Sequence, residues 1–267
     1  LFLGFRSYLT EIELGSHDKF IEVLDRGINT AKTSKKIPVT DAMLSAIKQA
    51  GIDQVTALSN FNLPADFFSK EAMMLGSSTD LAEKDDHLEG EISGISASNI
   101  PFWFKGYYKP GEEIAKIEDW DERVNHIAEN AKSWDIGALS GIPAWIELML
   151  QKVIEHHNLE NIHEIWPNLK VYTSGGVAFG PYEKSFKALL GKPVTVIDTY
   201  LASEGYIATQ TRPETDAMQL NTENGIYFEF VPMNPDYINE DGSLKQNAPS
   251  VSLDNVVLNQ DYILIIS

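Results

Sequence analysis

The chain lacks cysteine, and this single absence excludes several kinds of chemistry. With no Cys among 267 residues, the chain has no disulfide, no thiolate nucleophile and no cysteine-ligated metal. The composition permits a reducing compartment, so a cytoplasmic protein is expected. Long apolar runs are also missing: no stretch of about 18 apolar residues predicts a transmembrane helix, and residues 1–9 are too short and too polar for a secretion signal.

Basic residues are scarce. The chain has 21 Lys and Arg against 39 Asp and Glu, which gives a formal net charge of −18. Nucleic-acid and anionic-membrane surfaces need clustered Lys and Arg, so the sequence argues against both kinds of partner. An acidic protein can still bind ATP, because that site needs only local donors and Mg²⁺. The hydrophobic fraction of 43% and the length are ordinary for a globular α/β protein.

Several well-known catalytic motifs do not occur. The sequence has no G-x-G-x-x-G after a strand, no Walker lysine motif and no G-x-S-x-G, so a hydrolase triad has no anchor. His163-Glu164 lacks the second histidine of a zinc protease motif, and the adjacent His156 and His157 point to different sides of a helix. We therefore interpret these three histidines as surface or helix C-terminal residues, not as metal ligands.

The middle of the chain alternates short apolar runs with loops and amphipathic segments. This pattern predicts an α/β fold in which strand, loop and helix recur. If the strands pair in parallel, their loops gather at one sheet edge, where open α/β sheets bind ligands. The expected strands are residues 136–139, 169–172 and 194–197; the loops are Ser140–Trp145, Thr173–Gly180 and Thr199–Gly205; the helices are Asp119–Trp134, Pro143–Leu159 and Pro181–Leu190.

Elements on either side of this region are predicted from local signals. A short helix is expected within residues 17–27, and a better one begins after Thr40, a good N-cap. Residues 71–75 and 262–266 are expected strands, and Asn224-Gly225 predicts a tight β-hairpin turn before a strand at 227–230. Residues 79–118 are rich in loops. Their aromatic residues 102–108 are expected to form a core or subdomain contact; the alternative is a lining for an apolar substrate.

Four residue types at the predicted loops favour a nucleotide with a metal ion. Gly175 and Gly176 bring backbone N–H groups close to a ligand, because no side chain intervenes. Tyr200 offers a flat face for a purine, and Ser203 offers a hydroxyl for a phosphate. Glu204 is a hard oxygen ligand for Mg²⁺. Each residue alone would indicate only a turn or a buried partner; together, at successive loops, they favour nucleotide binding.

These segments are similar to a known family. The stretch IWPNLKVYTSGGVAFGPYEKSFKALLG, followed by TYLASEGYIA, resembles the Gretchen Hagen 3 family of acyl acid–amido synthetases, in particular its bacterial branch. The resemblance runs from about Thr30 to the end of the chain. It includes TSKKIPVT, EGEISGISASNIPFW, the SGIPAW region, LNTENGIYFEFVP and DYILIIS. The ordered series of segments is more specific than the Tyr-Leu-Ala-Ser-Glu motif alone.

The resemblance implies a member of the adenylate-forming superfamily. The expected fold is an α/β domain with a mixed, largely parallel sheet flanked by helices and an additional β-rich part. The expected activity is that of an ATP-dependent ligase, which activates a small carboxylic acid as an acyl-adenylate and transfers the acyl group to an amine, usually an amino acid. The alternatives are an acyl-CoA ligase and a degenerate nucleotide-binding or scaffold protein. The oligomeric state is left open.

The resemblance also implies roles for individual residues. Glu204, as the Mg²⁺ ligand, and Ser203 would be catalytic. Gly141, Ile142 and Trp145 would lie near the acyl group. The nucleotide-binding residues would be Thr33, Ser34, Lys35, Ser174, Gly175, Gly176, Tyr200 and Ala202.

The sequence departs from the family pattern in two places. The family's phosphate loop reads Thr/Ser-Ser-Gly-Thr-Thr, a glycine and then Lys-x-Ile-Pro, whereas here Thr33-Ser34 is followed at once by Lys35. The family's aromatic-Arg-x-Gly-Asp motif and C-terminal lid are missing, and the sequence stops at Ser267 in or just after an apolar strand. We therefore expect residues 1–267 to be an incomplete N-terminal adenylation domain. A Ser34–Lys35 Cα distance of about 3.8 Å would indicate a true deletion, and a much wider one omitted residues.

Overall fold

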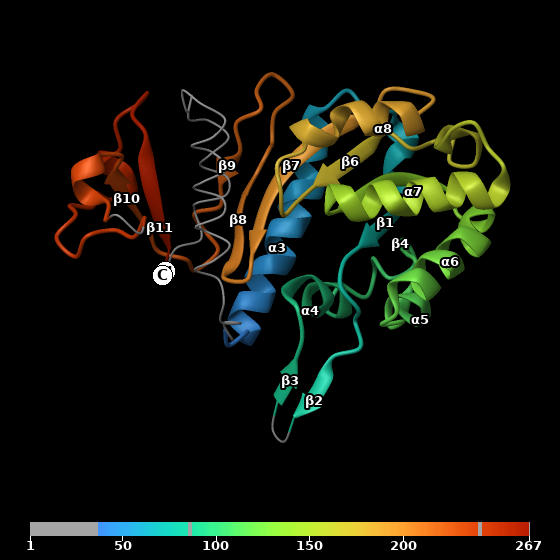
Figure 1. Cartoon of the computed structure of the whole chain (residues 1–267), viewed down its shortest axis with the longest axis horizontal. Coiled ribbons are helices and arrows are strands. Elements are labelled where there is room, and N and C mark those ends of the chain that lie inside the picture. Colours follow the sequence, from blue (N-terminus) through green and yellow to red (C-terminus); the bar gives the residue numbers. More distant parts are fainter. Residues whose placement is uncertain (1–36, 85–86, 240–241, 267) are drawn as a thin grey trace. The chain divides into compact units, whose positions relative to one another are not determined.

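The computed structural model describes residues 37–84, 87–239 and 242–266 (Figure 1). The larger compact unit is Val39–Asn224, and the described C-terminal residues from Gly225 onward belong to a second unit. Three predicted features lie outside the described residues: the helix within 17–27, the Ser34–Lys35 junction, and the nucleotide-binding roles of Thr33, Ser34 and Lys35.

A seven-stranded sheet organises the larger unit. Its order is β4-β1-β5-β6-β7-β8-β9; the first five strands are parallel to their neighbours, and β8 and β9 are antiparallel. The predicted mixed, largely parallel sheet is therefore confirmed. The strands are β1 Glu71–Leu75, β4 Tyr108–Lys109, β5 Ile136–Gly141, β6 Val171–Ser174, β7 Thr195–Ala202, β8 Gly205–Thr209 and β9 Gln219–Leu220.

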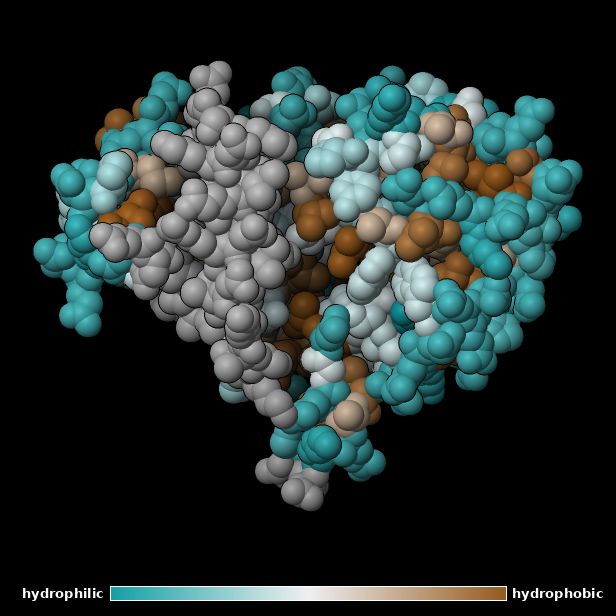
Figure 2. Space-filling model, in the orientation of Figure 1, coloured by the Kyte–Doolittle hydropathy of each residue, from teal (hydrophilic) through white to brown (hydrophobic). Residues whose placement is uncertain are grey.

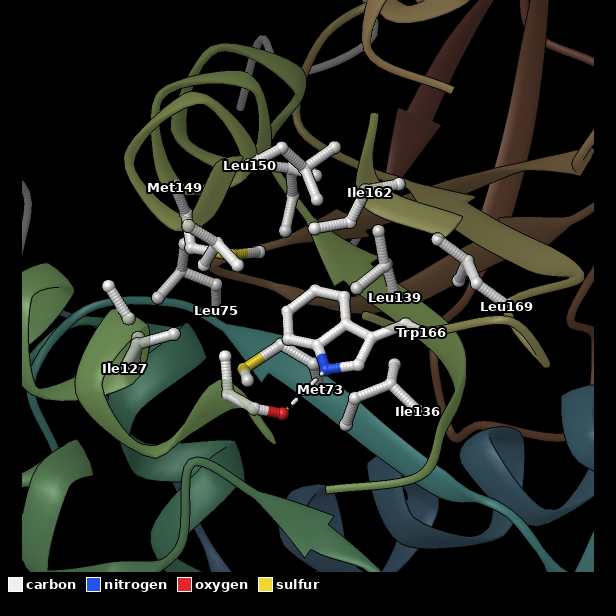
Figure 3. Close-up of a cluster of buried hydrophobic side chains, with 14 of the residues drawn as sticks. Met73, Leu75, Ile127, Ile136, Leu139, Met149, Leu150, Ile162, Trp166 and Leu169 are labelled. Atoms are coloured by element: carbon white, nitrogen blue, oxygen red, sulfur yellow. Dashed lines mark hydrogen bonds between the residues drawn. The ribbon is translucent and has the colours of Figure 1, made fainter. Parts of the chain in front are cut away.

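Three helices pack on one face of this sheet: α6 Trp120–Asn130, α7 Pro143–His157 and α8 Glu183–Leu189. Their apolar sides meet alternate residues of β1, β5 and β6 in the main core, because side chains on a strand alternate between the two faces. Figure 3 shows Trp166 at the centre of this core, where its Nε1 donates a hydrogen bond of 3.0 Å to Ala131 O. The surface over α6 that Figure 2 shows is hydrophilic, as its amphipathic sequence predicts.

The other face of the sheet is covered by α3 Asp41–Ala57 and the segment that follows it. Leu58, Phe61 and Phe67 pack against Val171 of β6 and Ile197 of β7. Farther along the sheet, α3 packs against β8 through a cluster made of Ile47, Ala50 and Tyr206, with Ile92 and Leu201 beside it. Helices therefore cover both faces and leave the sheet edge at the strands' carboxyl ends for a site.

The predicted helix starts are confirmed by their caps. The Thr40 side chain accepts a hydrogen bond from Met43 N at the start of α3, and Asp119 accepts one from Glu122 N at the start of α6. Pro143 is the first residue of α7. The ends are less well predicted: α7 stops at His157, two residues early, because Asn158 turns into the left-handed region with φ +54°.

Residues 79–118 contain more regular structure than predicted. They form a hairpin of β2 Ala82–Lys84 and β3 His87–Glu89, the helices α4 Ile92–Ser98 and α5 Glu112–Ala115, and the edge strand β4. Among their aromatic residues, Tyr108 is buried, but Phe102, Trp103 and Tyr107 are 85%, 54% and 43% exposed. The expected core contact is therefore wrong for those three residues, which lie exposed in a turn-rich segment. A substrate lining stays a prediction.

The second unit contains a two-stranded antiparallel sheet. β10 Phe228–Pro232 pairs with β11 Tyr262–Ile266, so the predicted final strand is confirmed. The predicted hairpin at Asn224-Gly225 is wrong. Gly225 does adopt a positive φ of +77°. However, the preceding strand β9 pairs with β8, and β10 pairs with β11, which begins about thirty residues after the start of β10. The short helices Pro235–Tyr237 and Leu253–Asn255 lie in the connection between them.

Among the described residues, no helix is both long and apolar enough to cross a membrane. The same residues hold no group of three or more His, Asp or Glu side chains suited to a metal ion. His156 and His157 lie in the last turn of α7, as predicted, but His163 is buried, so the surface interpretation is wrong for that residue.

Candidate functional site

The carboxyl ends of four parallel strands are aligned. In register, Leu75 of β1 lies opposite Gly141 of β5, Gly141 opposite Ser174 of β6, and Ser174 opposite Asp198 of β7. The loops that follow β1, β5 and β6 therefore start side by side. The predicted gathering of loops at one sheet edge is confirmed for the segments that begin at Ser140 and Thr173.

Glycines allow the ends of β5 and β6 to approach closely. Gly141 has φ +153°, and a Cβ added there would lie 2.5 Å from Leu75 O; Gly176 has φ +80°, and its added Cβ would lie 3.2 Å from Ile142 Cγ1. Only glycine fits such positions without strain. Tyr172 Oη also donates a hydrogen bond of 2.9 Å to Gly141 O. Gly141, Ile142 and Gly176 are thus brought together.

The Ser174–Gly176 segment meets β7 at Thr199. Thr199 Oγ1 donates a hydrogen bond of 2.9 Å to Ser174 O, and a Cβ added at Gly175 would lie 3.1 Å from the same Oγ1. Tyr200, the predicted purine-binding residue, directly follows Thr199 on β7, the strand residue that contacts the glycine segment. Ser174 is only 1% exposed, and its side chain lies close to the Tyr172 hydroxyl, whose pKa it lowers against the larger effect of burial.

The segment Thr199–Gly205 is not a loop, which corrects the sequence prediction. β7 continues to Ala202, and only Ser203 and Glu204 form the turn into β8. Pairing of β7 with β8 extends the strand beyond the end of β6, and Leu201 is partly buried against the α3 cluster. Between Tyr200 and Glu204, only Leu201 and Ala202 are strand, and Ser203 begins the two-residue turn that contains Glu204. The predicted base-binding residue therefore lies on β7, and the predicted metal-binding residue lies in the turn just beyond the end of that strand.

The carboxylate of Glu204 suits a cation. Its Oε2 is buried and has no hydrogen-bond partner among the residues that the structure describes, and no described Lys, Arg or His forms an ion pair with it. A buried carboxylate oxygen without a partner is unfavourable, so this environment favours a bound positive charge. Mg²⁺ is often held by one or two carboxylates together with substrate phosphates. The residue present therefore fits a magnesium ion that arrives with a nucleotide.

The residues predicted for the acyl group are partly in the core. Trp145 N donates to Ile142 O in the first turn of α7, and the Trp145 ring packs on Trp120 with centroids 5.5 Å apart. The Arg123 guanidinium lies over the other ring of this pair, 5.4 Å from the Trp120 centroid. Gly141 and Ile142 lie at the sheet edge. Trp145, in the first turn of α7, instead packs on Trp120 of α6.

Sequence analysis missed two polar groups near this edge. Asp198 lies opposite Ser174, and burial, followed by the charge of Asp216, raises the pKa of its carboxyl group. Tyr206 Oη donates to Gln54 Oε1 at 3.0 Å, and Gln54 Nε2 donates to Thr173 Oγ1 at 3.4 Å.

Burial raises the pKa of Tyr206 to about 12, so this phenol stays protonated and able to donate. Its bond to Gln54 connects β8 to α3. In the sequence, the only indication of Asp198 and Tyr206 was their position beside or within the segment TYLASEGYIA.

A family model described as the GH3 family N-terminal domain matches residues 28–195, which is more than half of the chain. The chain belongs to the GH3 family. The match includes β1, β5 and β6 with the Ser140–Trp145 and Ser174–Gly176 segments of this GH3 protein, and it ends at the first residue of β7.

One solved structure supports the fold, and two others are less similar. A GH3.15 acyl acid amido synthetase matches with a TM-score of 0.61 at 11% identity, over 97% of this chain and 56% of that one. A 2-hydroxyisobutyryl-CoA ligase gives 0.45 at 13% identity, over 76% and 43%, and ATP-bound MatB from Rhodopseudomonas palustris gives 0.38 at 12%, over 75% and 32%. No curated protein sequence matches this chain. The GH3 protein thus spans little more than half the length of the synthetase that it resembles in fold.

Proposed function

We propose that this GH3-family protein activates a small carboxylic acid with ATP and transfers the acyl group to an amine, expected to be an amino acid. The observation that supports this most directly is the pairing of two features on β7. The glycine segment Ser174–Gly176 meets the strand at Thr199, and Glu204, whose buried Oε2 has no hydrogen-bond partner among the described residues, lies in the turn just beyond the end of the strand. A nucleotide is elongated, with its base and its phosphates at opposite ends, and matches this arrangement.

In this proposal the base and ribose lie beside Tyr200, Ala202 and the Ser174–Gly176 backbone. The phosphates extend along β7 toward Ser203 and Glu204. Gly175 and Gly176 leave their backbone N–H groups accessible, and both are at least partly exposed. Residues 33–35 are proposed as a further phosphate contact.

Glu204 would hold the magnesium ion, which supplies neutralisation of phosphate charge when it is bound. The chain's own residues orient the reactants. The carboxylate oxygen of the acid forms a bond to the α-phosphorus, and the bond from that phosphorus to pyrophosphate breaks. The amine nitrogen then attacks the acyl carbon, the bond to AMP breaks, and the protons released by the amine pass to solvent. Bound reactants held in line gain most of their rate from this positioning.

The acid is proposed to lie next to Gly141 and Ile142. Gly176 approaches Ile142 within van der Waals distance, and Trp145 fixes the first turn of α7 behind them. This places the acyl group on the β5 side of the edge and the nucleotide on the β7 side. Residues 1–267 are proposed to act as the adenylation domain.

A product screen tests this function. The full-length protein is incubated with Mg·ATP, a panel of carboxylic acids, and either amino acids or coenzyme A, while pyrophosphate release is followed and products are identified by mass spectrometry. We expect acid-dependent pyrophosphate release and an amide product. A thioester product would instead identify an acyl-CoA ligase. A protein that gives no calorimetric heat with millimolar Mg·ATP would be a scaffold, and the proposal would be wrong.

A further inference from the structure

A second group of polar side chains lies at the same sheet edge, in the loop after β1. Ser77 Oγ donates a hydrogen bond of 2.5 Å to Glu91 Oε2, and Ser93 Oγ donates one of 3.1 Å to Ser77 Oγ. The Ser77 amide in turn donates to Ser93 Oγ at 3.0 Å. Glu91 is exposed and has no basic partner within the described ranges. These three residues, the Ser77–Glu91–Ser93 cluster, have no role in the function proposed so far.

Two glycines build this cluster by letting the loop touch α4. A Cβ added at Gly94 would lie 2.2 Å from Ser78 O, and one added at Gly76 would lie 2.9 Å from Ser93 Cβ. Any larger residue at Gly94 would push the loop away from the helix, since contacts this short do not occur between real atoms. The position of Ser77 against Ser93 is therefore fixed by backbone packing.

The cluster lies between the two parts of the proposed site. On one side, Ser77 follows Leu75, which is in register with Gly141 at the start of the acyl segment. On the other side, Ile92, between Glu91 and Ser93, packs in the same apolar group as Leu201 and Tyr206, the strand residues that flank the Ser203–Glu204 turn. α4 therefore places a carboxylate beside the region where the acyl group and phosphates would meet.

We propose that Glu91, aided by Ser77, binds the protonated amino group of the acceptor. This inference rests on the proposed function and names the chemistry of its second substrate. An α-amino group has a pKa of about 8, so an acceptor amine arrives mostly as a cation. An ammonium has three donors and no acceptor, and carboxylate and hydroxyl oxygens complement it.

The two acids at this edge then have different tasks. The Oε2 atom of Glu204 is buried, which suits a metal ion that enters with the nucleotide. Glu91 is exposed, which suits a substrate cation that binds after adenylation and must leave as product.

The variant Glu91→Gln tests the proposal, because it removes the charge and keeps the shape. Two acceptors are compared at pH 7.5: the amino acid that gives most product, which is cationic, and hydroxylamine, which is uncharged there. We expect the variant to keep acid-dependent pyrophosphate exchange and hydroxamate formation near the wild-type level. Its KM for the amino acid should rise roughly tenfold, since a charged hydrogen bond is lost. Glu83→Gln, an exposed acid on β2, is the matched control and should change neither reaction.

Three results would contradict the inference. Equal loss with both acceptors would mean that Glu91 has only a structural role, and unchanged kinetics with the amino acid would mean that it binds no amine. A wild-type protein without acid-dependent pyrophosphate exchange would contradict the proposed function, and the role of Glu91 would then be wrong as well. The exchange assay on the wild type separates that case from the other two.

Discussion

At the scale of single residues, the site is marked by a polar atom that lacks an ordinary partner. Glu204 Oε2 is buried and has no hydrogen-bond partner in the described part of the chain. Buried polar atoms are nearly always paired, so an unpaired carboxylate oxygen beyond the end of β7 indicates where a ligand belongs. The sequence could identify Glu204 by motif, but its burial depends on tertiary packing and could not be predicted.

His163 leads to a prediction about pH. Burial lowers the pKa of this imidazole, Gly191 N donates to its Nδ1 at 3.1 Å, and Nε2 lies 3.1 Å from Leu169 O, so the fold holds the neutral ring. A lowered folded-state pKa means that the unfolded chain takes up the proton first. The neutral His163 ring therefore contributes its full stabilisation above the pKa of histidine in the unfolded chain, about 6.5, and this contribution is lost as the pH falls below that value.

We expect the free energy of unfolding of the wild type to decrease from pH 7 to pH 5. His163→Gln, which cannot titrate, should show a smaller decrease. Urea unfolding at several pH values measures both. An equal decrease in the two proteins would show that His163 does not contribute.

At the scale of secondary-structure elements, close packing of α4 against the β1 loop predicts the effect of one methyl group. Gly94→Ala should lower the free energy of unfolding by about 2 kcal/mol, because its Cβ would meet a backbone carbonyl oxygen that cannot move freely. Gly106→Ala is the control, since nothing lies within 4 Å of its added Cβ. Chemical denaturation compares them. A Gly94→Ala protein as stable as the control would contradict the described packing.

The elements also show what a sequence can predict. The predicted cap Thr40 and the N1 residue Pro143 located two helices, because these positions use local chemistry that a sequence displays. The amphipathic spacing located a third helix, which begins after Asp119. β7 was predicted too short, because its extension depends on pairing with β8. Gly225 does adopt a positive φ, but β9 pairs with β8 and β10 pairs with β11, and this pairing depends on residues distant in sequence. Local signals fix where elements begin, and non-local pairing decides how far strands extend.

At the scale of the whole molecule, net charge and architecture agree with a small-molecule ligand. A charge of −18 repels polyanions, yet the site needs only backbone N–H groups and one cation to receive a nucleotide. Helices on both faces leave the carboxyl ends of the parallel strands for ligands, as in other open α/β sheets. The family match and the fold agreement with an acyl acid amido synthetase concern this same region.

The central claim is that a nucleotide and its metal ion bind along β7, from Ser174–Gly176 to Glu204. Acid-dependent exchange of labelled pyrophosphate into ATP, measured on full-length Glu204→Ala, tests it most directly. Glu214→Ala, an exposed acid on the segment after β8, is the control. The account predicts loss of exchange by at least about a hundredfold in Glu204→Ala, with an unchanged circular dichroism spectrum and full activity in the control. Wild-type exchange rates in Glu204→Ala would contradict the account.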